Sequence, residues 1–210
     1  MFSDHSALFV VVDLFIAGAE TTSTTLTWLF LYIAMFPEKQ EKLHQELDRI
    51  VGNSRLPCLA DRPDMPYTEA VIHETLRFST LVPFSLFHNT LKDVEFQGYT
   101  IPKDTMIIPN VYEAHFDPIV WGDPENFRPE RFLTKDGKFQ RHEAMIAFSV
   151  GKRVCLGESL ARDELFLFTT SLLQKFSVEM DPNSPRPKLE SKFNQIVTPN
   201  PHKLLFHARD

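Results

Sequence analysis

The sequence predicts a mainly α-helical fold with small β-sheets, an α+β class. A long apolar stretch opens the chain, from Ala7 to Phe36, and further segments of helical length follow in both halves. Short segments rich in β-branched and aromatic residues lie between positions 84 and 108, next to turn signals. Ten of the fifteen prolines follow position 100, so irregular backbone is concentrated in the second half.

The first expected helix runs from about Ser3 to Met35, and Pro37 ends it. It is long and apolar enough to span a bilayer, but Asp13 and Glu20 interrupt it. Carboxylates inside a membrane span are costly, so we interpret the segment as a helix that crosses a protein core, with a membrane span as the alternative. The first five residues contain no Lys or Arg, which argues against a secretory signal.

Two more helices are expected before position 80. Pro37 favours the start of the first, which extends from Glu38 to Val51 and ends at Gly52. Residues 53–66 are expected to form a loop, and the next helix runs from about Tyr67 to Ser79.

Short strands follow the third helix. They are expected at positions 84–88, 94–96, 99–101 and 106–108. Turn signals at Lys92-Asp93 and Gln97-Gly98 separate some of them, so the segment predicts small antiparallel sheets.

The remaining expected elements are a short helix, a long helix and a pair of strands. In chain order they lie at 111–116, at Glu158–Phe176, and at Gln195–Thr198 with Lys203–His207. Residues 117–148 show little periodicity, and an irregular stretch of that length in a compact domain is usually functional.

The composition excludes several classes of function. The net charge is −6 and the basic residues are dispersed, so no nucleic-acid surface is expected. One loose basic group is interpreted as a solvated face, with docking of an acidic partner as the alternative. It comprises Lys135, Lys138, Arg141, Lys152 and Arg153. The two cysteines make no disulfide framework and favour a reducing compartment, and Cys58 is expected to be inert.

The stretch from Phe148 to Gly157 is the most informative part of the sequence. It places Cys155 between Gly151 and Gly157, with a basic pair just upstream and the start of a helix just downstream. Glycine lets the backbone approach a flat ligand, while basic neighbours and a helix N-terminus favour the thiolate form of a cysteine. The alternative is a free cysteine packed at a loop–helix junction.

A charged pair lies on the expected third helix. Glu74 and Arg77 fall on the same face as the apolar residues Ala70, Val71 and Phe78. A buried ion pair is costly unless further hydrogen bonds satisfy it, so a third partner is expected.

Arg131, in the segment Pro129-Glu130-Arg131-Phe132, is the candidate partner, because a guanidinium can clamp a carboxylate that is already paired. Two other E-x-x-R strings, Glu46/Arg49 and Glu125/Arg128, are interpreted as surface pairs.

Four motifs in this order resemble those in the C-terminal half of the cytochrome P450 family of haem-thiolate monooxygenases. They are Ala17-Gly18-Ala19-Glu20-Thr21-Thr22, Glu74-x-x-Arg77, Pro129-Glu130-Arg131-Phe132 and Phe148–Gly157. The resemblance covers essentially the whole chain and is strongest to microsomal animal members. It implies one partial domain over residues 1–210, the C-terminal half of the cytochrome P450 fold, with the N-terminal half of that fold absent.

The resemblance implies a site for haem b (iron protoporphyrin IX). Cys155 would be the metal ligand, because a thiolate pushes electron density onto the iron. The other residues expected at the cofactor are Arg153, His88, Phe148, Gly157 and Ala17. Arg153 and His88 would pair with the haem propionates and Phe148 would shield the thiolate, although His88 also fits a strand histidine with a backbone partner.

The first helix would lie on the other face of the haem. There Thr21 and Glu20 would deliver protons during oxygen activation. Without the resemblance, the Thr21 hydroxyl is expected to bond back to the carbonyl four residues earlier. The substrate pocket would be apolar and would include Phe15, Ala17, Val82 and Ile196, with ordinary core packing as the alternative for each.

The implied activity is insertion of one oxygen atom of O2 into an apolar organic substrate such as a steroid, fatty acid or xenobiotic. Electrons would come from NADPH through a reductase. The expected location is the cytosolic face of the endoplasmic reticulum membrane, through an N-terminal anchor that this sequence does not contain. The alternative is a truncated haem-binding fragment without monooxygenase activity, which folds poorly alone because apolar residues would be exposed.

Overall fold

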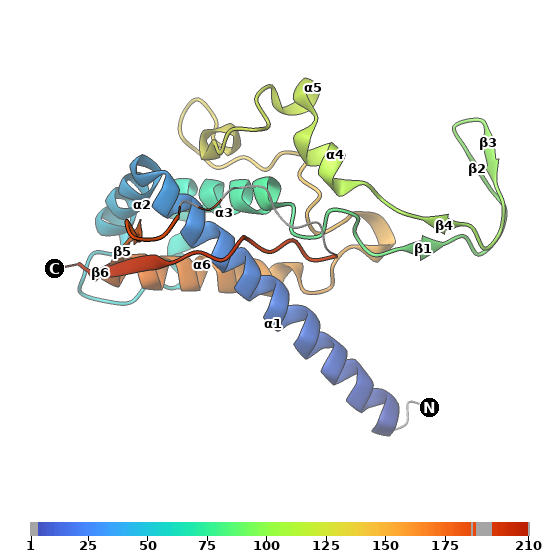
Figure 1. Ribbon diagram of the computed structural model, residues 1–210, viewed down its shortest axis with the longest axis horizontal. Coiled ribbons are helices and arrows are strands. Elements are labelled where there is room, and N and C mark those ends of the chain that lie inside the picture. Colours follow the sequence, from blue (N-terminus) through green and yellow to red (C-terminus); the bar gives the residue numbers. More distant parts are fainter. Residues whose placement is uncertain (1–3, 186, 188–194, 210) are drawn as a thin grey trace.

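Helices form the body of the molecule, and three two-stranded antiparallel sheets accompany them in the described part of the chain (Figure 1). The computed structural model describes residues 4–185, 187 and 195–209. The expected mainly α class with small β-sheets is confirmed.

Helix α1 (Asp4–Met35) has two halves with different surroundings. Its N-terminal half projects away from the other elements, and its apolar side chains are exposed (Figure 1). Its C-terminal half crosses the core, where the buried Trp28 donates from Nε1 to the carbonyl of Val197 at 2.9 Å. The core-crossing interpretation therefore holds only for the C-terminal half, and the expected start at Ser3 lies outside the described residues.

The apolar character of α1 also leaves the membrane alternative open. Among the described residues, His5–Met35 is the one helical segment long and apolar enough to cross a bilayer, by length and composition.

Helices α2 (Pro37–Ile50), α3 (Pro66–Ser79) and α6 (Glu158–Lys175) pack with the buried half of α1. Proline occupies the first turn of both α2 and α3, where a backbone N–H has no helical partner to lose. The expected bounds of all three helices are confirmed to within one residue. Helix α3 is buried along almost its whole length, which makes it the central element of the bundle.

Helix α2 holds the start of α3. The buried Glu46 carboxylate accepts hydrogen bonds from the backbone of Tyr67 at 2.9 Å, and from the backbone and hydroxyl of Thr68, each at 2.8 Å. An acidic group at this position meets unpaired N–H groups and the positive end of the helix dipole. The surface pairing expected for Glu46 and Arg49 is therefore wrong: Glu46 faces inward, and Arg49 is exposed.

Short helices lie in, or just after, the regions expected to be irregular. They are η1 (Leu59–Asp64), α5 (Pro118–Trp121), η2 (Pro129–Phe132) and η3 (Gly151–Arg153). The expected helix at 111–116 is confirmed as α4 (Val111–Phe116), whose first turn is capped by the Asn110 side chain.

Two sheets form an arm that extends from the body (Figure 1). Strand β1 (His88–Asn89) pairs with β4 (Met106–Ile107), and β2 (Val94–Phe96) pairs with β3 (Tyr99–Ile101). Gln97 and Gly98 have φ values of 53° and 81°, as a two-residue hairpin turn requires. The strand expected at 84–88 is wrong before His88, because Ser85 has a φ of 52° that interrupts an extended backbone.

The third sheet pairs β5 (Phe176–Met180), directly after α6, with β6 (Leu204–Ala208). The expected pairing of residues 195–198 with residues 203–207 is wrong. The Val197 N–H donates to the carbonyl of Leu81 at 2.8 Å, and its carbonyl accepts from Trp28, so this backbone is already paired elsewhere.

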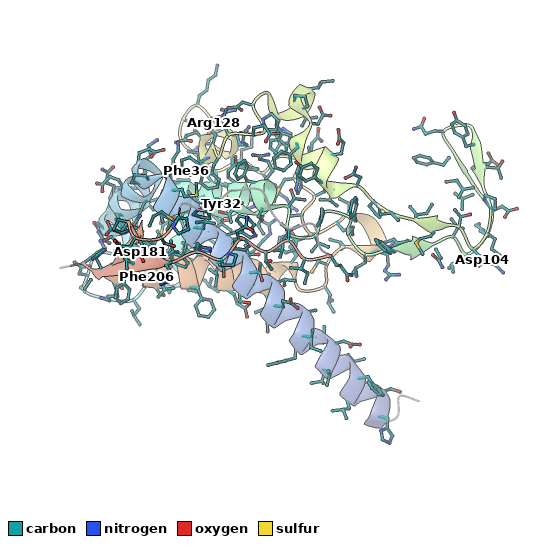
Figure 2. The ribbon with its side chains drawn as sticks, viewed as in Figure 1. Tyr32, Phe36, Asp104, Arg128, Asp181 and Phe206 are labelled. Carbon is teal, nitrogen blue, oxygen red and sulfur yellow. The ribbon has the colours of Figure 1, made fainter. Side chains whose placement is uncertain are left out.

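Tyr32 of α1 lies in an aromatic cluster that joins three parts of the core. Its ring centroid lies 5.3 Å from those of Trp28 and Phe78 and 4.9 Å from that of Phe127. Figure 2 shows Tyr32 within the crowded body of the molecule, far from Asp104 on the extended arm. The cluster therefore fixes α1 against α3 and against the irregular segment before η2.

Candidate functional site

The predicted ion-pair residues come together in the core. Glu74 and Arg77 are both 0% exposed, with Arg77 Nε donating to Glu74 Oε2 at 2.8 Å and Nη2 to Oε1 at 2.9 Å. Arg131 Nε also donates to Glu74 Oε1, at 3.1 Å, as the sequence predicted for a third partner. The backbone N–H of Arg128 adds a further bond to Glu74 Oε1 at 2.8 Å, so the carboxylate accepts four hydrogen bonds.

The remaining guanidinium donors bind backbone carbonyls. Arg77 reaches the carbonyls of His115 at 2.7 Å and Pro124 at 2.9 Å. Arg131 reaches those of Trp121, Asp123 and Asn126 at 3.0–3.1 Å. These bonds offset the cost of burying the charges, and they tie α3 to the whole segment from α4 to η2.

The surface pairing expected between Glu125 and Arg128 is wrong, because Arg128 pairs with Asp123 instead. Arg128 makes two bonds to Asp123, at 2.7 and 3.0 Å. The bonds from Arg128 hold the pKa of Asp123 at about 2, so this carboxylate stays ionised beside Arg131 as well.

His115, which the sequence did not single out, links the ion-pair helix to the cysteine segment. The N–H of Ile146 can only donate, so His115 Nε2, 3.1 Å away, is the acceptor. Nδ1 then carries the hydrogen and donates to Thr80 Oγ1 at 3.1 Å, and that hydroxyl donates to the carbonyl of Arg77 at 2.6 Å. Burial, and then the nearby Arg77, lowers the pKa of His115 to about 3, so the link is neutral.

The Cys155 loop is a tight turn that leaves the thiol accessible. Cys155 is exposed and forms no disulfide. Its N–H donates to the carbonyl of Phe148 at 2.8 Å, which closes the loop, and Ser149 and Gly151 take left-handed φ values of 65° and 73° within it. A side chain on Gly157 would lie 4.0 Å from the sulfur, so Gly157 borders the thiol directly.

The single cysteine ligand suits a metal that is already coordinated within a cofactor. The described residues contain no group of three His, Cys, Asp or Glu side chains able to hold a bare ion. A single thiolate suits haem, whose macrocycle supplies four ligands. The loop also exposes Val150, Val154 and Leu156, apolar side chains able to cover an apolar macrocycle.

The two predicted propionate partners, Arg153 and His88, lie on separate segments of the chain. Arg153 lies in the exposed η3 turn next to Cys155. His88 has a buried Nδ1 without a hydrogen-bond partner within the described part of the chain. An orphaned buried nitrogen is the signature of a missing polar partner, so His88 fits a carboxylate ligand better than a fully bonded strand histidine.

Thr21 and Glu20 lie where α1 leaves the core. The Thr21 hydroxyl donates to the carbonyl of Ala17 at 2.7 Å, and Glu20 is exposed. Nothing lies within 4 Å of a side chain built at Gly18, so this face of the helix is open.

The four residues predicted for the substrate pocket fall into two groups. Val82 and Ile196 are half-buried against the core, and the bond between Val197 and Leu81 brings their chain segments together. Phe15 and Ala17 lie on the exposed half of α1, where Phe15 is 75% exposed. The enclosed pocket stays a prediction.

His73 and Arg162 are further residues that sequence reasoning missed. His73 directly precedes Glu74 and is 1% exposed, and Arg162 lies on the first turns of α6. The unusual number of histidines, eight in the chain, was the only signal available.

Comparison with known proteins identifies the family. The family model for cytochrome P450 matches residues 1–206. Cytochrome P450 2D26 of Rattus norvegicus is 47% identical over 208 residues, covering 99% of this chain and 42% of the rat protein. Cytochrome P450 2U1 of Homo sapiens is 42% identical over 208 residues, covering 99% of this chain and 38% of the human protein. The chain thus spans about two fifths of the length of these relatives, and it belongs to the cytochrome P450 family.

Proposed function

We propose that the chain forms the haem-binding part of a haem-dependent monooxygenase, in which the Cys155 thiolate would hold the iron. The observation that carries this proposal is the exposed, unbridged Cys155 on a tight loop, with no second set of metal ligands among the described residues. The family match supports it, because haem with a cysteine thiolate is the cofactor that this family implies.

When bound, haem b supplies the iron centre at which one atom of O2 enters an apolar organic substrate, with electrons from NADPH through a reductase. The chain would hold the cofactor by three kinds of contact. Cys155 would ligate the iron, Arg153 and the orphaned Nδ1 of His88 would pair with the propionates, and the half-buried Phe148 would exclude water from the sulfur.

Thr21 and Glu20 would move protons on the other face of the cofactor. The Thr21 hydroxyl donates to the carbonyl of Ala17, which leaves its lone pairs free to accept a hydrogen bond from a water. The exposed Glu20 can exchange protons with solvent. Val82 and Ile196, with Phe15 and Ala17 across the site, would supply the apolar walls for the substrate.

The proposed cellular setting is the cytosolic face of the endoplasmic reticulum membrane, the microsomal fraction. A soluble or membrane-bound reductase domain needs an exposed route to the cofactor, and Cys155 and its loop are exposed. The candidate partners are therefore O2, an apolar substrate and an NADPH-dependent reductase, without nucleic acid.

The absorption spectrum of the ferrous–carbon monoxide complex tests the proposal. A thiolate-ligated haem gives a red-shifted Soret band, and Cys155→Ala should abolish it. Cys58→Ala is the matched control, because Cys58 is the other cysteine and lies in the η1 region. A red-shifted band that survives Cys155→Ala, or is absent from the unaltered chain supplied with haem, would contradict the proposal.

A haem-binding chain without turnover is the second candidate. The exposure of Phe15, at 75%, favours it, because the described residues leave that side of the site open. Substrate turnover with a reductase, measured on a sample that already shows the red-shifted band, separates the two candidates.

A further inference from the structure

An open surface depression of about 620 Å³, called the cavity below, lies beside Cys155, and charged side chains line it. Arg62, Arg141 and Arg162 supply positive charge, and Glu69 and Glu158 supply negative charge. These groups pair with one another, so the cavity does not offer a free charge for a small ion. Ion pairs join the charged side chains that line the cavity.

His73 lines this cavity in a single defined tautomer. Nδ1 lies 2.8 Å from the carbonyl of Glu69, which only accepts, so Nδ1 carries the hydrogen. Nε2 is then bare and accepts from Nη1 of Arg162, which has no lone pair to offer in return. Both ring nitrogens are thereby satisfied only in the neutral imidazole.

The ring of His73 cannot turn freely. Its centroid lies 4.5 Å from that of Phe139 and 5.6 Å from that of Phe132, so aromatic rings hold it in place. Other charges nearby are Glu69 Oε2, 4.0 Å from Nδ1, and the guanidinium groups of Arg62 and Arg141. Burial, and then the charge of Arg162, lowers the pKa of His73 to about 3, which keeps it an acceptor at neutral pH.

Arg162, which His73 holds in place, contacts Glu158 and Phe148, the residues that flank the Cys155 loop. Its Nε donates to Glu158 Oε1 at 3.0 Å. Its guanidinium carbon lies 5.3 Å from the centroid of the Phe148 ring, a cation–π distance. Arg141 supports the same arrangement through a 3.0 Å bond to Glu158.

Phe148 and Glu158 are also the two residues that bind the backbone of Cys155. The Cys155 N–H donates to the carbonyl of Phe148 at 2.8 Å, and the Cys155 carbonyl accepts from the N–H of Glu158 at 3.4 Å. Arg162 therefore contacts both anchors of the cysteine peptide. Because His73 sits next to Glu74, the same chain of contacts joins the cysteine to the buried ion pair.

We propose that His73 is a positioning residue for the Cys155 ligand, acting through the guanidinium of Arg162 on Phe148 and Glu158. The proposal deepens the proposed function, since it rests on Cys155 as the haem ligand. It assigns His73 no contact with haem or substrate. The effect of His73 is to fix the orientation of the Cys155 sulfur.

Amide hydrogen exchange of the 210-residue chain without haem tests this directly. His73→Phe keeps an aromatic ring but removes the acceptor, and Arg162→Met removes the donor. Each should speed exchange of the Cys155 amide about tenfold, because the loop loses its fixed anchors, while the amides of α2 keep their protection. His73→Gln, whose amide can both donate and accept, should restore most of the protection.

The matched controls remove similar groups elsewhere. Arg209→Met deletes a guanidinium that binds Leu173 and Asp48, and His44→Phe replaces another buried histidine. Neither should change exchange at Cys155. After haem addition, His73→Phe should also lower the fraction of the ferrous–carbon monoxide complex with the red-shifted band, and His73→Gln should restore it.

Unchanged exchange at Cys155 in both His73→Phe and Arg162→Met would overturn the proposal, as would an equal loss of protection along the whole chain. If His73→Phe does not fold, Arg162→Met and its Arg209 control decide the question alone. The exchange result does not depend on haem. A chain that fails to bind haem would refute the proposed function, and the exchange rates would still decide whether His73 positions the loop.

Discussion

The Glu74 carboxylate is held in the core by four hydrogen bonds, three to Oε1 and one to Oε2. Two guanidinium groups and the N–H of Arg128 donate to its two oxygens. In a medium of low polarity such a group is tolerated only while all its partners stay in place. Single-atom changes here should therefore be costly.

Replacing Glu74 by Gln tests this at the residue scale. The amide NH2 would face Arg donors, so we expect the free energy of unfolding to fall by about 3–5 kcal/mol, the range for breaking a buried pair. Urea denaturation followed by circular dichroism measures it. Glu143→Gln, at an exposed position, is the control and should change stability by less than about 0.5 kcal/mol. A loss below about 1 kcal/mol for Glu74→Gln would show that the carboxylate is not buried in solution.

His115 should make stability depend on pH. Its pKa is about 3 in the folded chain and ordinary, near 6.5, when unfolded, so between these values the unfolded chain binds the extra proton. Stability is therefore fully present above pH 6.5 and is lost as the pH falls, by up to about 1.4 kcal/mol per pH unit.

Urea denaturation at pH 7, 6 and 5 for the unaltered chain and for His115→Gln isolates this effect. The variant should be less stable at pH 7, because Gln lacks the ring that fills this fully buried site, and its stability should fall less steeply with pH. Parallel pH profiles would mean that His115 is protonated equally in both states.

At the scale of elements, α3 depends on a residue of another helix for its N-terminal cap. Glu46→Gln keeps the size of the side chain but removes its charge and one acceptor. We expect a loss of about 1–2 kcal/mol in the free energy of unfolding, and faster amide exchange at the first turn of α3. Glu41→Gln, on the exposed side of α2, is the control. Equal stability of the two variants would contradict the capping role.

The helices were predictable because their limits are set locally. Pro37 and Gly52 mark the limits of α2 by their own backbone chemistry, and the apolar stripe of Ala70, Val71 and Phe78 identifies α3. The pairing of the strands was harder to predict from the sequence. The extended segment around Val197 bonds Leu81 and Trp28, far away in sequence, so no local pattern could assign its partner.

The same distinction separates the predictable and unpredictable parts of the site. Glu74 and Arg77 share a helical face with apolar residues, which local spacing reveals. Glu46 shares a helix with Arg49, yet its partners lie 21 and 22 positions later, so local spacing pointed to the wrong partner. His73 and His115 bind backbone atoms or distant side chains, and backbone atoms carry no sequence signal.

At the scale of the whole molecule, the apolar half of α1 should dominate the surface chemistry. Phe9 and Phe15 are 68% and 75% exposed, so Phe9→Ser with Phe15→Ser should reduce binding of a hydrophobic dye. The free energy of unfolding should change by less than about 0.5 kcal/mol, because these rings are mostly exposed. Fluorescence titration and urea denaturation measure the two effects.

Phe166→Ser is the control for that double variant, because Phe166 is fully buried in α6 and should cost about 3–5 kcal/mol. If the double variant binds as much dye as the unaltered chain, or loses comparable stability, then the projecting half of α1 is covered in solution.

The division of α1 into a free half and a held half also gives the molecule a mechanical property. Its 32 residues form a rod of about 48 Å at 1.5 Å per residue, with a pivot near Thr21 and Thr22, where burial begins. A sideways push on the free end acts as torque on the held end, where Tyr32 meets Phe127. Phe127 precedes Arg128, whose N–H donates to Glu74. A force on the exposed half of α1 is therefore transmitted through Phe127 and Arg128 to the buried Glu74 carboxylate.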